Sequence, residues 1–84
     1  MKSSTFDTAY NRYIKNARAH VKGTTGLKRA ELVAEYFKEH TAHPHVDFTY
    51  KMMMTNRTSD NAFAVELMQS LANLCAENEV YNAA

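Results

Sequence analysis

The stretch HPHVDFTYKMMMTN, residues 43–56, decides the fold because its pattern suits both a strand and a helix. Apolar residues alternate with others from Val46 to Met54, which is the period of a half-buried strand. Helical spacing fits as well, and it divides the large apolar residues into two groups. These groups are Val46, Tyr50, Met53 and Met54 on one side, and Phe48 and Met52 on the other.

Three local features favour the helix over residues 44–55. Pro44 suits the first turn of a helix, Asp47 would lie near its positive N-terminal end, and consecutive methionines are good helix formers. A strand would also need a partner strand, and the chain offers only a few suitable residues around Val80. The alternative is an α+β fold in which residues 46–54 form a strand that pairs across a dimer.

The rest of the chain predicts three longer helices, so the expected fold is a small all-α bundle with a shorter fourth helix. The helices are expected at Thr5–Val21 with Ser3, Ser4 or Thr5 as cap, at Leu27–His40 after the turn GTTG with Thr25 as cap, and from Ser59 or Asp60 onward. The last helix carries the apolar face Phe63, Leu67, Leu71 and Leu74 and is expected to be the most buried. Residues 77–84 are predicted to be a frayed tail.

Length and composition predict one ordered domain over residues 1–84. Hydrophobic residues make up 45% and charged residues 23%, close to globular averages, which excludes a disordered chain. No apolar run is long enough for a signal peptide or a membrane span. The lone Cys75 excludes an internal disulfide and fits a reducing compartment, so we expect a cytoplasmic protein with no membrane partner.

Charge is distributed unevenly along the chain. Residues 1–29 carry seven basic residues and one acidic residue, whereas residues 30–84 carry three basic and eight acidic residues. A phosphate backbone rewards several cations on one side, so the basic residues of this first part are candidates for nucleic-acid binding. The candidates are Arg12, Lys15, Arg18, Lys22, Lys28 and Arg29. A solvated polar face of an amphipathic helix is the other interpretation, because no helix-turn-helix, zinc-finger or RNA-binding signature is present.

Residues 46–54 hold more apolar surface than one small core can cover on two sides of a helix. Methionine and aromatic side chains repack against varied partners, so the stretch is a candidate interface with another protein or a second copy of this chain. The interface candidates are Phe48, Tyr50, Met52, Met53 and Met54, together with Leu32 and Tyr36 from the preceding helix. The alternative is a central helix that the other three enclose.

Nothing in the sequence predicts catalysis. His40, His43, His45 and Cys75 hold zinc-binding atoms, but their spacing matches no standard site, so we expect no metal and no cofactor. The sequence has no nucleophile elbow and no HExxH helix, and a chain this short has little room for a substrate pocket. The favoured interpretation is a non-catalytic regulator, an inhibitor or adaptor of a larger protein, of a size common among phage and mobile-element proteins. The alternative is a nucleic-acid-binding protein that uses the basic face of the first helix.

Overall fold

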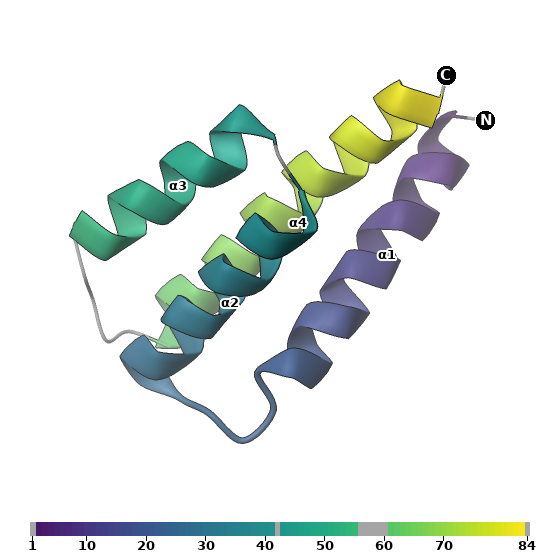
Figure 1. Ribbon diagram of the computed structural model, residues 1–84. Helices are drawn as coiled ribbons and strands as arrows, with labels where there is room; N and C mark the ends of the chain where they lie inside the picture. Colours follow the sequence, from purple (N-terminus) through teal and green to yellow (C-terminus); the bar gives the residue numbers. More distant parts are fainter. Residues whose placement is uncertain (1, 42, 56–60, 84) are drawn as a thin grey trace.

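The computed structural model describes residues 2–41, 43–55 and 61–83, and it describes their side chains except those of residues 2–4, 53 and 54. Over these ranges the chain forms four helices and no strand, which confirms the all-α prediction. The helices are α1 (Lys2–His20), α2 (Gly26–His40), α3 (Pro44–Thr55) and α4 (Asn61–Ala83). Successive helices run in opposite directions, so the start of α1 and the end of α4 lie at the same end of the molecule (Figure 1).

The ambiguous stretch is a helix, α3, and the alternative in which residues 46–54 form a strand is wrong. Pro44 is the first residue of α3, where its missing N–H costs nothing, and Asp47 lies in the first turn. The carbonyl of His43 accepts the N–H groups of Val46 and Asp47 at 3.0 and 3.3 Å. Val46 is fully buried and anchors the helix to the core. Local helix signals therefore outweigh the alternation of apolar residues.

The core lies where α2 and α4 pack along each other, which is the most extensive contact in the molecule. α1 packs mainly against α4, and α3 packs mainly against α2 and less against α4. Over their described residues α1 and α3 do not touch, because they flank the central pair on opposite sides (Figure 1). Of the predicted apolar face of α4, Leu71 is fully inaccessible and Leu67 is 6% exposed, whereas Phe63 and Leu74 are half-buried against the core.

The GTTG turn joins α1 to α2 and depends on both glycines. Gly23 and Gly26 have φ angles of 87° and 60°, in the left-handed region that side chains other than glycine rarely adopt. Thr25 is the N-cap of α2 as predicted, but its side chain makes no capping hydrogen bond. The N–H of Gly26 donates instead to the side chain of Asn61 at 3.1 Å. This bond ties the first residue of α2 to the first residue of α4.

The start of α1 and the end of α4 differ from the prediction. α1 begins at Lys2, so residues 3–5 lie inside the helix and the predicted cap among them is wrong. The predicted start of the last helix at Ser59 or Asp60 lies outside the described residues, and α4 is described from Asn61. α4 continues as helix to Ala83, well past Glu77. Arg12 of α1 forms an ion pair with Glu79, which gives this last part of α4 a tertiary contact. Fraying of residues 77–84 in solution stays a prediction.

Candidate functional site

The outer side of α3 carries two exposed apolar side chains, which we call the α3 ridge. Phe48 is 62% exposed and Met52 is 48% exposed. They lie four residues apart, so they are neighbours on one side of the helix. Val46 and Tyr50 belong to the other side, where Val46 is fully buried and Tyr50 packs half-buried against the core. α3 therefore has an anchored side and an apolar outer side.

Charged side chains connect α3 to α2 at the surface. The carboxylate of Asp47 lies 3.9 Å from the ammonium of Lys38 on α2 and 3.2 Å from that of Lys51 one turn along α3. The ammonium of Lys38 also lies 4.3 Å from the centre of the Tyr50 ring. All three charged side chains are about half exposed or more, so each pair contributes little stability.

Histidines cap the ends of the helices around α3. The Nδ1 atom of His43 accepts the backbone N–H of His45 at 3.1 Å, which satisfies one of the free N–H groups at the start of α3. The N–H of His43 donates to the hydroxyl of Thr41 at 3.2 Å. His40 pairs its Nδ1 with the carbonyl of Tyr36 at 2.7 Å, at the end of α2. These imidazoles have structural partners in the fold.

The structure gathers no metal ligands and no activated nucleophile in the part of the chain that it describes. No group of three histidine, cysteine, aspartate or glutamate side chains there could hold a metal ion. Cys75 is 1% exposed, and burial, followed by the charge of Glu79, raises the pKa of its thiol to about 12. A thiol with that pKa stays protonated at neutral pH, so Cys75 acts as a small core residue.

Tyr36 is not at the surface, which corrects the prediction that it is an interface residue. Its side chain is 8% exposed, and its ring centre lies 5.2 Å from that of His20 on α1 and 4.1 Å from that of His40. Burial raises the pKa of its hydroxyl. The reason is the position of α1, which lies beside α2 and covers a residue that projects away from the main apolar stripe. Leu32 is also half-buried against the core.

Of the predicted interface residues, only Phe48 and Met52 are both described and largely exposed. The side chains of Met53 and Met54 lie outside the described part of the structure. The interface predicted over residues 46–54 is thereby reduced, for the described side chains, to the α3 ridge.

The predicted basic residues separate into two groups. Arg12 is engaged, because its guanidinium forms an ion pair with Glu79 and lies 5.3 Å from the centre of the Tyr13 ring. The hydrogen bond that Arg12 donates to the carboxylate of Glu79, followed by the charge of that carboxylate, raises the pKa of Arg12. Arg29 is half-buried, and its Nε atom has no hydrogen-bond partner among the described residues. Arg12 is exposed as well, and the exposed members that form no ion pair with a described residue are Lys15, Arg18, Lys22 and Lys28.

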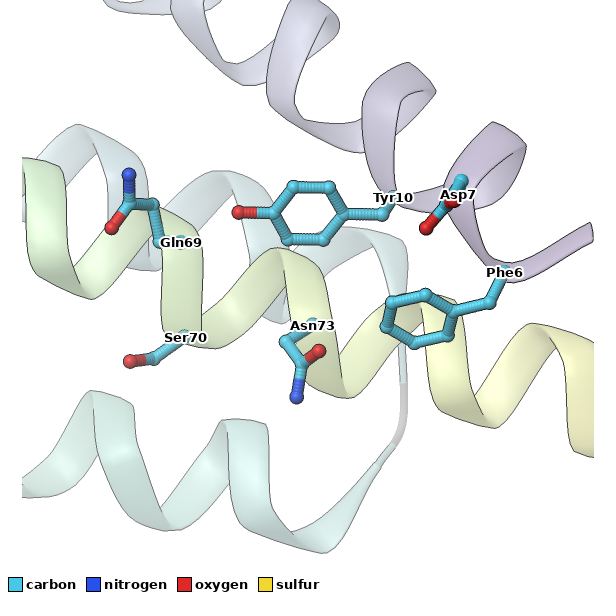
Figure 2. Close-up of a pocket in the computed structure, with 6 residues that line it drawn as sticks. All are labelled: Phe6, Asp7, Tyr10, Gln69, Ser70 and Asn73. Atoms are coloured by element: carbon cyan, nitrogen blue, oxygen red, sulfur yellow. The ribbon is translucent and has the colours of Figure 1, made fainter. Parts of the chain in front are cut away.

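An open groove between α1 and α4 was not predicted from the sequence. It has a volume of about 410 Å³, and its lining consists of Phe6, Asp7, Tyr10, Gln69, Ser70 and Asn73. Figure 2 shows the two rings reaching from α1 toward α4, whose polar side chains form the other wall. The rings of Phe6 and Tyr10 stack with centres 6.1 Å apart. The two walls come from distant parts of the chain, so no local pattern could have indicated the groove.

No protein family, no curated protein and no solved structure matches this chain. Among the described helices, none combines the length and the apolar character needed to cross a bilayer. Function must therefore be argued from the exposed faces of the four helices.

Proposed function

We propose that this protein is a non-catalytic regulator, an inhibitor or adaptor that binds a larger protein partner through the α3 ridge. The observation that carries the proposal is the exposure of Phe48 and Met52, at 62% and 48%, on a helix whose opposite side is fixed by the buried Val46. Large apolar side chains in the middle of an interface supply most of its binding energy. A helix that is already formed presents two of them here without the cost of ordering the backbone.

The size of the ridge favours a partner with a groove. At their observed exposure the two side chains offer together roughly 200 Å² of surface. A stable interface buries about 800 Å² on each partner. Two flat copies of the ridge would fall well short of that area, whereas a groove encloses the flanks of the helix as well. Anchors spaced four residues apart on one helix are the pattern that such grooves accept.

The non-catalytic part of the proposal is supported by the state of the reactive groups. The only thiol, Cys75, is buried and protonated, and the groove between α1 and α4 holds one carboxylate, Asp7, without a basic side chain beside it in its lining. A free, reduced cysteine supports placing the protein in the cytoplasm.

The test replaces the ridge by charges in the double variant Phe48→Asp, Met52→Glu. The matched control is Val65→Glu, Tyr81→Asp, which introduces the same two charges at apolar residues of α4 that are 39% and 82% exposed. Immobilised wild type and both variants are used for capture from a nuclease-treated lysate of the source cells, after circular dichroism has shown that all three are helical. We expect wild type and control to retain the same protein and the ridge variant to lose it.

A folded ridge variant that captures the same protein as wild type would contradict the proposal. Self-association, which the sequence predicts through residues 46–54, is measured in the same samples by light scattering. If wild type is a dimer and only the ridge variant is a monomer, then the partner that binds the ridge is a second copy of this chain.

A further inference from the structure

α1 presents a row of three cations on its outer side, which we call the basic row: Lys15, Arg18 and Lys22. All three are exposed, and none forms an ion pair with a described residue. Their spacing of three and then four residues places them along one side of the helix. Lys22 lies two residues beyond the last residue of α1, but the N–H of Val21 still bonds to the carbonyl of Ala17 at 3.1 Å and that of Lys22 to the carbonyl of Ala19 at 3.4 Å, so the chain keeps a helical turn up to Lys22. The row is about 10 Å long at the helical rise per residue.

No acidic residue lies near the row in sequence. Between Thr8 and Ala30 the chain contains six basic residues and no aspartate or glutamate. Glu79 of α4 pairs with Arg12 of α1, and no described carboxylate forms an ion pair with the three cations of the row. The row is therefore a site of uncompensated positive charge, although the whole protein carries a net charge of only +1.

We infer that the basic row binds the phosphate backbone of double-stranded nucleic acid without reading its sequence. The chemistry of the row matches phosphates, because it consists of charge without an apolar anchor. Its exposed neighbours are Asn11, Asn16 and Ala19, which are polar or small. A protein interface would need large apolar side chains at its centre, and the row has none. Phosphates need only cations and hydrogen-bond donors.

The apolar face of α1, opposite the row, makes an anionic membrane or a single strand unsuitable as the ligand. A helix that binds a membrane surface inserts its apolar face, but that of α1 is packed into the core, with Ala17 and Val21 fully buried. Single strands are held by stacking their bases on exposed rings. Three rings of α1, Phe6, Tyr10 and Tyr13, are half-buried, and the exposed ring of His20 packs against Tyr36 of α2 with ring centres 5.2 Å apart. A duplex, whose bases are already stacked, requires no such ring.

The structure also sets the strength of the interaction. The sequence offers six candidate cations, and neutralising six phosphates would give log K a slope of about −5 against log salt concentration. Arg12 is paired and Arg29 is half-buried, and Lys28 belongs to the next helix. The three cations of the row predict a slope of about −3. Binding is therefore weak at physiological salt and measurable at low salt.

The experiment measures binding of a short labelled duplex by fluorescence anisotropy over a series of low salt concentrations. Wild type is compared with Lys15→Gln, Arg18→Gln, which removes two cations from the row. The matched control is Lys38→Gln, Lys51→Gln, which removes two cations beside α3 and lowers the net charge equally. We expect a slope of about −3 for wild type and control and about −1 for the row variant. DNA and RNA duplexes are tested in parallel, and binding of either one supports the inference.

Three results would overturn the inference. The first is an equal loss of duplex binding in the row variant and in the control, and the second is stronger binding of a single strand of the same length. The third is binding of anionic lipid vesicles by a protein that does not bind the duplex. Because α1 does not touch α3, the ridge variant Phe48→Asp, Met52→Glu should bind the duplex almost as wild type does. Failure of duplex binding is thus distinguishable from failure of protein capture by the ridge.

Discussion

α3 and α4 are both rich in large apolar residues, but they use them in opposite ways. α4 buries seven residues, among them Leu67, Met68 and Leu71, because it packs against all three other helices. α3 fully buries Val46 and leaves Phe48 and Met52 outside, because it lies at the edge of the bundle and leans mainly on α2. The number of neighbouring helices, and not the apolar content of the segment, decides which side chains are buried. Four changes test this contrast, from the largest expected effect on stability to the smallest.

Leu71→Ala should have the largest effect, because the side chain is fully buried in the centre of the molecule. Loss of its buried atoms and the remaining cavity should lower the free energy of unfolding by about 2–5 kcal/mol. That is a large part of the ~5–15 kcal/mol of a typical domain, and Leu67→Ala should act similarly. Thermal and urea denaturation measure the change. Val65→Ala, on the exposed side of the same helix, is the control, and an unchanged melting temperature for Leu71→Ala would disprove the central position of α4.

Val46→Ala should lower the free energy of unfolding by about 1.5–3 kcal/mol, because it removes two buried methyl groups from the contact between α3 and the core. Val46 is the fully buried anchor of an edge helix, so we expect the loss to appear first in α3 itself. Hydrogen exchange should show faster exchange over residues 44–55 than over α2 and α4. Uniformly faster exchange in all four helices would show instead that α3 is as integral to the core as α4.

His43→Ala should weaken the start of α3 by about 0.5–2 kcal/mol, because it removes the acceptor for the N–H of His45. His43→Asn provides another acceptor at the same position and should preserve stability. The two variants are compared by urea denaturation and by exchange of the amides in the first turn of α3. Equal stability of both variants would show that the imidazole does not act as the cap.

Phe48→Ala and Met52→Ala should change the free energy of unfolding least, by about 0.5 kcal/mol or less in either direction. Both side chains lie mainly in water, and alanine is a better helix former than phenylalanine. Chemical denaturation of the isolated protein measures the effect. A loss comparable to that of Leu71→Ala would mean that the ridge supports the fold and is not reserved for a partner.

The sequence was sufficient for the elements whose cause is local. The helix over 44–55 follows from Pro44, Asp47 and the helix-forming methionines, and helical spacing alone places Phe48 and Met52 opposite Val46. These positions could be derived because each depends on residues within a turn or two of the chain.

Features that depend on where two helices meet could not be derived. Tyr36 lies off the main stripe of α2 and was expected at the surface, but α1 covers it. Arg12 was counted as a free cation, but Glu79, far away in the sequence, is its ion-pair partner. Helical periodicity gives the direction of a side chain relative to its own axis, and it contains no information on which neighbour lies in that direction.

The central position of α4 has a consequence for the chain while it is being made. A ribosome adds about 5–20 residues per second, so the 23 residues of α4 take on the order of one to five seconds to complete after α3 has been synthesised. Until then α2 lacks the helix with which it makes its most extensive contact in the finished protein. Until α4 leaves the ribosome, the nascent chain therefore exposes apolar surface that the finished protein buries.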